Sequence, residues 1–449
     1  MARKFLALLL ILAQPLVAAA QVALPSLRLP SVPGVTGLSL SDERTLSGLS
    51  GDLDPRRLES LRLLYIRDLI RTHRREIEAD PNGAPILRGE VLAFSPTDVA
   101  LDKARAAGFT VVRERVLDGL DARIVVLKAP GGTATQRALR QLQGLDPDGS
   151  YDFNHLYTDS GVVGGALAGE ASPKAADVGT AGAAGATTKI GLVDGGVDTS
   201  HDVFRDIVIH QHGCSDAPVP AAHGTAVASL MIGRSPRFHG AAPGYELYAA
   251  DVYCGLATGG AVDAVADALA WLVREHVPVI NVSLVGPPNV MLESVVRRVV
   301  AHGHVIVAAV GNDGPAAPPL YPASYPDVVG VTAVDAHQRA LLEACRGRQV
   351  KFSAPGADMS AANPAQSYVT VRGTSFAAPI VAGLLAEALH EPDPAAAARA
   401  VSELAARAID LGAPGPDPVY GFGLVGGDLR PEVALATTAP PPRSAAAAH

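Results

Sequence analysis

Four polar residues in the second half of the chain have the types that acyl transfer requires. Asp194 and Asn312 each follow a run of apolar residues, and His223 and Ser375 each stand at the start of a segment rich in small residues. Acyl transfer needs a nucleophile, a base, an acid that orients the base, and donors for the oxyanion. Taken alone, each residue also fits a structural role, such as a turn, a helix start or an N-cap. Together they predict hydrolysis through a serine ester.

The order acid, base, amide and serine, together with the surrounding segments, resembles the subtilisin family of serine proteases. The resemblance spans most of 189–424. The segments that carry it are 190–196, 223–228, 309–314 and 373–379, and the further matches are 240–243, 280–284, 321–323, 353–356 and 421–423. The same order distinguishes the chain from chymotrypsin and from the α/β-hydrolases.

The resemblance implies a role for each matched residue. Ser375 would be the nucleophile, His223 the general base and Asp194 the residue that orients His223. Asn312 and the backbone N–H of Ser375 would form the oxyanion hole. Ser283, Leu284 and Val285 would form one edge of the substrate groove and pair with an extended polypeptide as an added strand. No cofactor and no metal are expected.

The chain departs from the family pattern near these residues. Gly195 stands where Thr or Ser commonly follows the acid, so we expect backbone donors to hold the Asp194 carboxylate. Val285 and Leu320 replace residues that are usually small, and we expect them to narrow the main side-chain pocket. The segment from His223 to 240 is short and lacks an Asn-rich loop, so we expect no calcium ion there.

Three cysteines leave three possibilities open: a disulfide, free thiols or part of a metal site. The sheet order of the family would place Cys214 and Cys254 at the ends of neighbouring strands, which makes a disulfide plausible and leaves Cys345 unpaired. The alternative is a transition-metal site made by His210, His212 and Cys214, for which no fourth ligand is evident.

The elements that must position these residues alternate between strands and helices. Near-continuous Val, Ile and Ala runs predict a doubly wound, mainly parallel sheet in an α/β domain over 189–430. We expect strands at 189–194, 246–253, 278–284, 304–310 and 328–334, and helices at 223–232, 261–276, 290–302 and 374–390.

A smaller α+β unit precedes this domain. The pattern over 89–157 is βαββαβ, which predicts a ferredoxin-like sheet with helices on one face. Subtilisin-like enzymes commonly carry such a prodomain, so the resemblance implies an intramolecular inhibitor whose last segment, 153–157, lies in the active-site groove. The Ala- and Gly-rich stretch 158–188 is expected to be a flexible connector containing the maturation site, between Tyr157 and Gly169.

The remaining segments have their own signatures. Residues 1–20 read as a secretory signal peptide rather than a membrane anchor, since the apolar run is short and Pro15 interrupts it. Residues 21–54 are expected to be a linker and 431–449 a disordered tail. The segment 55–88 contains a basic amphipathic helix over 55–80, which either covers its own domain or contacts a membrane surface.

The composition limits the possible functions. A formal net charge of −8 argues against a nucleic-acid-binding protein, which normally has a basic face. The leading hypothesis is a serine endopeptidase made as a zymogen and secreted to the periplasm or the extracellular space. The competing hypothesis is a binding protein of the same fold without catalysis, which the presence of all four residues disfavours.

Overall fold

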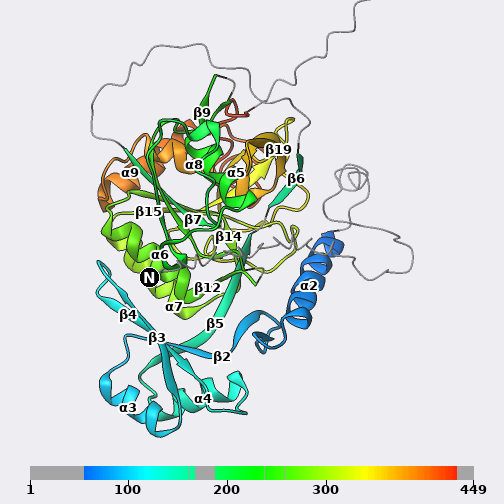
Figure 1. The fold of residues 1–449 in the computed structure, drawn as a ribbon. Coiled ribbons are helices and arrows are strands. Elements are labelled where there is room, and N and C mark those ends of the chain that lie inside the picture. The colour runs from blue at the N-terminus through cyan, green and yellow to red at the C-terminus, as the bar shows by residue number, and fades with distance from the viewer. Residues whose placement is uncertain (1–54, 160, 167–187, 237, 257, 432–449) are drawn as a thin grey trace, which may run out of the picture.

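The computed structural model describes residues 55–159, 161–166, 188–236, 238–256 and 258–431 (Figure 1). The expected signal peptide at 1–20, the linker at 21–54 and the tail from 432 onward lie outside the described residues.

The larger unit is built on a sheet of seven parallel strands in the order β17-β16-β15-β13-β7-β11-β8. Side chains that alternate along each strand enter two separate cores: Val305 and Val307 lie on one face, and Ile306 and Ala308 on the other. This burial of both faces explains the near-continuous apolar runs. The strands are β7 (Lys189–Asp194), β8 (Ile209–His212), β11 (Glu246–Asp251), β13 (Val279–Val282), β15 (Val305–Ala309), β16 (Val329–Val334) and β17 (Val350–Pro355).

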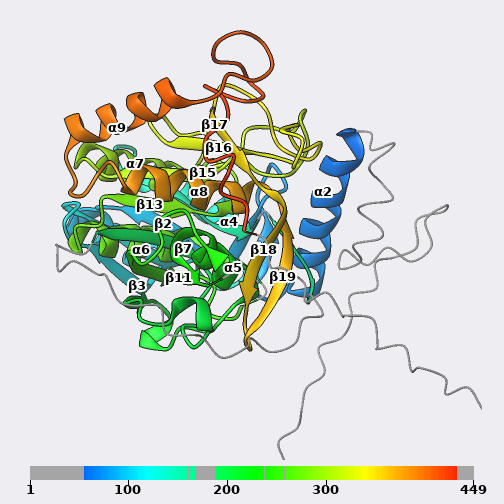
Figure 2. The same ribbon diagram turned by 90° about the horizontal axis from the view of Figure 1, so that it is seen from above.

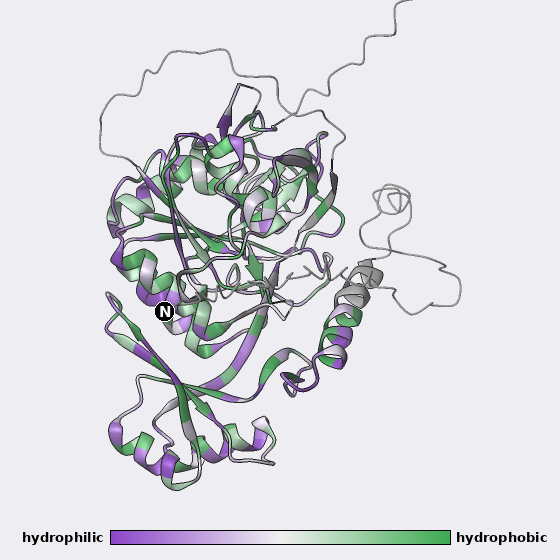
Figure 3. Cartoon of the chain, in the orientation of Figure 1, coloured by the Kyte–Doolittle hydropathy of each residue, from purple (hydrophilic) through white to green (hydrophobic). Residues whose placement is uncertain are grey.

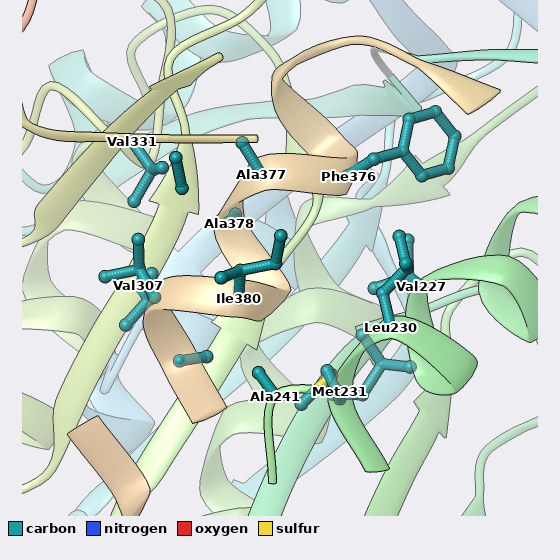
Figure 4. Close-up of a cluster of buried hydrophobic side chains, with 14 of the residues drawn as sticks. Val227, Leu230, Met231, Ala241, Val307, Val331, Phe376, Ala377, Ala378 and Ile380 are labelled. Atoms are coloured by element: carbon teal, nitrogen blue, oxygen red, sulfur yellow. The ribbon is translucent and has the colours of Figure 1, made fainter. Parts of the chain in front are cut away.

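Helices cover both faces of this sheet, as the view from above shows (Figure 2). The first core contains α5 (Ala222–Ile232), α8 (Thr374–Ala386) and α9 (Pro394–Arg407), and the second contains α6 (Val262–Arg274) and α7 (Val290–Ala301). Figure 4 shows Ile380 of α8 between Val307 of the sheet and Leu230 of α5, and all three belong to one buried cluster. The expected doubly wound α/β fold is confirmed.

The smaller unit has an antiparallel sheet in the order β5-β2-β4-β3, as expected for a ferredoxin-like unit. One face packs on its own two helices, and the other shares the core of α6 and α7, to which Leu92 and Val126 belong. The apolar residues of these strands are visible in Figure 3. The elements are β1 (Ile77–Ala79), β2 (Pro85–Phe94), α3 (Asp98–Ala106), β3 (Thr110–Leu117), β4 (Ala122–Lys128), α4 (Thr135–Leu145) and β5 (Ser150–Asp159).

Strand β5 pairs the sheet of the smaller unit with two short strands of the larger unit. Its last residues pair antiparallel with β12 (Gly260–Ala261) on one side and with β14 (Leu284–Val285) on the other. After β5 the chain forms β6 (Val162–Ala166), which pairs with β19 (Ser367–Arg372) of the hairpin that β19 makes with β18 (Ala357–Asn363). The remaining short elements are β9 (Arg234–Ser235), β10 (Phe238–His239) and the 3₁₀ turns Asp202–Phe204 and Cys214–Asp216.

Two predicted segments differ from the structure. The helix expected over 55–80 is α2 (Pro55–Thr72), and the rest of 55–88 forms a hairpin of β1 and β2. The Asp80 carboxylate accepts hydrogen bonds from the backbone of Asn82 and Ala84, and this turn connects β1 to β2. The connector expected over 158–188 is also partly wrong, because 158–159 belong to β5 and 162–166 form β6. Pairing with distant strands orders this Gly-rich segment.

Candidate active site

Asp194 and His223 form the closest pair of the predicted site. Asp194 is the last residue of β7, and both of its carboxylate oxygens lie 2.9 Å from Nδ1 of His223, near the start of α5. With the proton placed on Nδ1, the imidazole donates to the carboxylate and presents Nε2 on its other side. Both side chains are buried.

Backbone groups hold the acid, as expected from the missing hydroxyl. The N–H of Gly195 donates to Oδ1 of Asp194 at 2.7 Å. A Cβ at Gly195 would lie 2.8 Å from the Cβ of Ala221, the residue that caps α5. Gly224 is equally confined, because a Cβ there would press on the backbone of Gly195 and Gly196. The two glycines therefore let the start of α5 approach the end of β7 closely enough for the pair to form.

The surroundings of His223 favour its charged form. Burial alone lowers the pKa of this imidazole, but the charge of Asp194, the hydrogen bond to it and the charge of Asp159 together raise the pKa to about 9. Asp159 is the last residue of β5, so part of this shift comes from the smaller unit rather than from the larger domain.

Ser375 lies in the first turn of α8, immediately after the sharp turn at Gly373, whose φ is 140°. Its Oγ donates to the carbonyl of Ser283 at 3.4 Å, and the Oγ of Ser283 donates to the carbonyl of Ser375 at 3.0 Å. Within the described residues, Nε2 of His223 has no hydrogen-bond partner. The predicted nucleophile thus lies beside Ser283 of the predicted groove edge but is not hydrogen-bonded to the predicted base. Catalytic hydrogen bonds are often formed only in the reacting complex.

Phe376 links Ser375 to His223. Its fully buried ring lies with its centroid 5.2 Å from that of the imidazole. Because Phe376 directly follows the serine in α8, this contact fixes the distance between α8 and α5 next to both groups. No feature of the sequence indicates this role, since an aromatic residue in a helix is ordinarily a core residue.

Asn312 follows β15 and has a free amide hydrogen-bonding group. Its Oδ1 accepts from the backbone N–H of Thr374 at 3.1 Å, and Oγ1 of Thr374 accepts from the N–H of Gly311 at 3.1 Å. The buried Nδ2 of Asn312 has no partner among the described residues. A buried unpaired donor is costly, so its retention beside Ser375 is typical of a binding function. Thr374 thus orients the amide through its backbone N–H.

The groove residues lie where β5 meets the larger domain. Leu284 pairs with Asp159 and Val285 with Thr158, while Gly260 pairs with Tyr157 on the opposite edge. The Tyr157 side chain is fully buried, and its hydroxyl donates to the carbonyl of Pro287 at 2.6 Å. Leu320 and Val285 are buried in the same cluster as Tyr157.

Leu320 also reaches the residue next to the amide donor. A Cβ added to Gly311 would overlap the Leu320 side chain. Leu320 therefore fills space directly beside the backbone that leads to Asn312. A pocket next to His223 and Asp194 is lined in addition by Tyr65 of α2, Val219, Tyr253 and Leu256. The position of Tyr65 was not predicted, because nothing in a basic amphipathic helix indicates which site it will reach.

The sulfur atoms of Cys214 and Cys254 lie 2.16 Å apart, at disulfide distance, with their Cα atoms 5.2 Å apart. Cys345 is buried and is not part of this disulfide. The alternative metal ligands have separate partners: His210 lies 2.6 Å from Glu246, and His212 lies 3.3 Å from Asp267. The two histidines therefore pair with different carboxylates.

Asp194, Ser283 and Asn312 all follow parallel strands at the carboxyl edge of the sheet, where α/β enzymes assemble their sites. Comparison with known proteins is consistent with this arrangement. A family model described as the subtilase family matches residues 185–423, more than half of the chain. Subtilisin DY of Bacillus licheniformis is 31% identical over 260 residues, which cover 56% of this chain and 93% of that protein. A subtilisin of Bacillus pumilus is 32% identical over 255 residues, 54% of this chain and 90% of its own length.

The fold also resembles a solved structure. The crystal structure of fervidolysin from Fervidobacterium pennivorans, a keratinolytic enzyme related to subtilisin, matches with a TM-score of 0.62 and 21% identity. The match covers 78% of this chain and 62% of that one. The chain therefore belongs to the subtilase family and is a serine endopeptidase.

The described ranges contain no helix that is both long enough and apolar enough to cross a bilayer.

Proposed function

We propose that this serine endopeptidase cleaves extended polypeptides with Asp194, His223 and Ser375 as its triad. His223 takes the proton of the Ser375 hydroxyl as Oγ attacks the carbonyl, and returns it to the leaving amine. Asp194 holds the imidazole in the required tautomer and stabilises its cationic form. Water then hydrolyses the acyl-enzyme with His223 again acting as base. The Asp194–His223 pair at 2.9 Å supports this assignment.

Asn312 is assigned to the oxyanion hole. Its unpaired Nδ2 is the donor, and the hydrogen bond from Thr374 keeps the amide from rotating. The backbone N–H of Ser375 is the second donor, at the N-terminus of α8, where the helix dipole also favours negative charge.

We further propose that the chain is a zymogen and that the β2–β5 unit is its prodomain. The observation that carries this proposal is the pairing of β5 with both β12 and β14, which occupies the groove beside Ser283 and excludes other polypeptides. Polar contacts hold the β2–β5 unit against the larger unit. Arg113 lies 3.1 Å from Asp263 at the start of α6. The backbone N–H of Val290 in α7 donates to Asp152 at 2.8 Å. The prodomain is thus an intramolecular inhibitor.

The same pairing supports a substrate class. Main-chain hydrogen bonds on the groove edge formed by Ser283, Leu284 and Val285 require an extended strand, so unfolded polypeptides and exposed loops are the substrates. Leu320 and Val285 restrict the space beside Ser375 and favour small side chains before the scissile bond. Neither a cofactor nor a metal ion is needed for this chemistry.

The enzyme is proposed to act outside the cytoplasm, in the periplasm or the extracellular space. The secreted subtilisins that it resembles and the disulfide distance between Cys214 and Cys254 support this location. We assign the apolar face of helix α2 to a contact with the smaller unit rather than with a membrane surface, because Leu69 packs with Ile77 of β1 and Leu156 of β5.

A fluorophosphonate probe and hydrolysis of denatured casein test the proposal. The processed wild-type protein is expected to be labelled and to hydrolyse casein, whereas Ser375→Ala is expected to do neither while keeping its circular dichroism spectrum. Ser402→Ala, a change on the exposed side of α9, serves as the matched control. Absence of labelling in a folded, processed wild-type sample would support the binding-protein hypothesis instead.

A further inference from the structure

Two buried polar residues lie on the face of β13 that meets α8. Val279 belongs to the core of α5 and α8, whereas Ile280 and Val282 belong to the core of α6 and α7. Because side chains alternate along a strand, Asn281 and Ser283, which directly follows β13, lie on the same face as Val279. Both are fully buried. Buried polar side chains are costly unless they are hydrogen-bonded, so their presence in an apolar strand points to a specific contact.

The two side chains form a series of hydrogen bonds that ends at the backbone of Ser375. Nδ2 of Asn281 donates to Oγ of Ser283 at 2.8 Å, and this Oγ donates to the carbonyl of Ser375 at 3.0 Å. An amide nitrogen donates but does not accept, so the hydroxyl hydrogen of Ser283 is left for the carbonyl. Asn281 therefore fixes the direction in which the Ser283 hydroxyl donates.

Pro379 explains why the carbonyl of Ser375 takes a donor from outside its helix. In an α-helix, each carbonyl accepts from the backbone N–H four residues later. For Ser375 that residue is Pro379, which lies inside α8 and has no N–H. The proline ring also crowds the carbonyl four residues before it, which favours a partner outside the helix. Ser283 and Ser375 are fully buried, so the Ser283 hydroxyl takes the place of the missing N–H away from solvent.

Ser283 also contacts the side chain of Ser375. Oγ of Ser375 donates to the carbonyl of Ser283 at 3.4 Å. The end of β13 is thus connected to both the backbone and the hydroxyl of Ser375. If the Ser283 hydroxyl were absent, the buried carbonyl would lose this donor, and the first turn of α8 would shift toward another one. Such a shift would move Oγ and the backbone N–H of Ser375 relative to His223.

We infer that Ser283 and Asn281 are positioning residues for the nucleophile, and that Pro379 creates the need for them. The Ser283 hydroxyl fixes the backbone of Ser375, and Asn281 keeps that hydroxyl directed at the carbonyl. This role of the Ser283 side chain is separate from the pairing of its backbone with a substrate strand. The inference rests on the proposed function, in which Ser375 is the nucleophile.

A double-mutant cycle between Ser283 and Pro379 tests the inference. The measurement is the second-order rate at which a fluorophosphonate labels the processed enzyme, because this probe reacts with Ser375 and needs no strand on the groove edge. Ser283→Ala is expected to slow labelling about tenfold, since small displacements of reacting atoms have effects of this size. Pro379→Ala restores an N–H four residues after Ser375, so Ser283→Ala should cost less than about threefold in that background. An equal loss in both backgrounds, or no loss in either, would overturn the inference.

Peptide kinetics separate positioning from substrate binding. Ser283→Ala should lower kcat about tenfold and leave KM within about twofold, because the backbone of the groove edge is unchanged. A raised KM with a normal kcat would contradict the inference. Ser353→Ala is the matched control, since it removes a fully buried hydroxyl that has no hydrogen-bond partner among the described residues. It should change neither constant.

Asn281→Leu provides a second variant that keeps the Ser283 hydroxyl and a side chain of similar size. It should slow labelling by about threefold, because the hydroxyl remains but its direction is no longer fixed. When Asn281→Leu is added to Ser283→Ala, no further loss is expected, since both residues act through one hydrogen bond. Losses that multiply in the double variant would contradict this series of contacts.

The wild-type protein distinguishes failure of this inference from failure of the proposed function. A folded, processed wild-type sample that the fluorophosphonate does not label excludes Ser375 as the nucleophile and with it the proposed function. A wild-type sample that is labelled, together with a cycle that shows no coupling between Ser283 and Pro379, excludes only the positioning role.

Discussion

The backbone N–H of Thr374 donates a hydrogen bond to the side-chain oxygen of Asn312 at 3.1 Å. Through this contact the residue before the nucleophile orients the amide that is proposed to bind the oxyanion. Nucleophile and oxyanion donor are therefore positioned by the same turn at the start of α8, and a shift of α8 would move them together.

The first prediction concerns this amide. Asn312→Leu removes the donor while keeping a side chain of similar size, and is expected to lower kcat by roughly 10²–10³ with little change in KM. Steady-state kinetics on a peptide substrate checks this. Thr374→Ser, which keeps both hydrogen bonds, should remain close to wild type. A normal kcat for Asn312→Leu would exclude Asn312 from the oxyanion hole.

The second prediction is a pH dependence of self-processing. A general base must be neutral, and the pKa of His223 is raised to about 9 in the precursor, so the rate should rise with pH up to about that value. Asp159→Asn removes one of the charges that raise this pKa, and should move the midpoint of the profile to lower pH. Rates of self-cleavage across the alkaline range measure the midpoint.

The exposed Asp148, in the turn before β5 and at the opposite end of that strand from Asp159, supplies the control for this experiment. Asp148→Asn should leave the midpoint unchanged. A shift to higher pH in Asp159→Asn, or equal shifts in both variants, would contradict the electrostatic explanation.

The third prediction concerns the prodomain interface. Asp263 is buried against Arg113 and accepts a hydrogen bond from Asn154 at 2.8 Å. Asp263→Asn should shorten the delay between self-cleavage, seen on a gel, and casein hydrolysis by about tenfold or more. Added salt should shorten the delay in wild type. Asp102→Asn, on the exposed side of α3, should have no effect, and an unchanged delay in Asp263→Asn would rule out this contact as a determinant of release.

The fourth prediction concerns Cys214 and Cys254, which are 40 residues apart in sequence. A bridge that closes a loop of this length stabilises a protein by about 4 kcal/mol in the chain-entropy model. Cys254→Ser, placed in the Ser375→Ala background to prevent self-digestion, should lower the free energy of unfolding in urea by an amount of this order. A reductant should destabilise the parent but not the variant. Equal sensitivity of both proteins to the reductant would argue against the bridge.

The fifth prediction tests why Gly195, and not a larger residue, follows Asp194. Gly195→Ser places a Cβ 2.8 Å from the Cβ of Ala221 and should lower kcat about tenfold by moving the start of α5 and with it His223. The double variant with Ala221→Gly should recover most of the activity, because the obstructing atom is removed. Failure of Ala221→Gly to restore activity would contradict this steric explanation.

Strong local patterns made much of the fold predictable. Strand β7 has the predicted bounds, and α5 and α7 begin within one residue of the predicted positions, because buried apolar runs and helix starts are local signals. The strand pairing of β6 was not predictable, since Val162–Ala166 contains two glycines and its order depends on β19, about two hundred residues away.

The same limit applies to the site. The motifs identified Asp194, His223, Asn312 and Ser375 as candidates, but their geometry depends on contacts that no short segment encodes. Thr374 orients Asn312 and Phe376 packs on His223 only because α8 lies against α5 and the end of β15. Tertiary packing, rather than local propensity, decides such contacts.

Strand β5 pairs with β14 and strand β6 pairs with β19, so the chain is held by a strand ladder on each side of the short stretch between β5 and β6. If the chain is cut between these two strands, neither new end is released by the cut itself, because each remains paired with the enzyme through its own ladder. The effective concentration of the two products at the site is then far above that of any free polypeptide. Immediately after the cut, the enzyme would therefore be inhibited by its own products. Dissociation of β5 and β6 from the enzyme, rather than peptide hydrolysis, would set the time at which it becomes active.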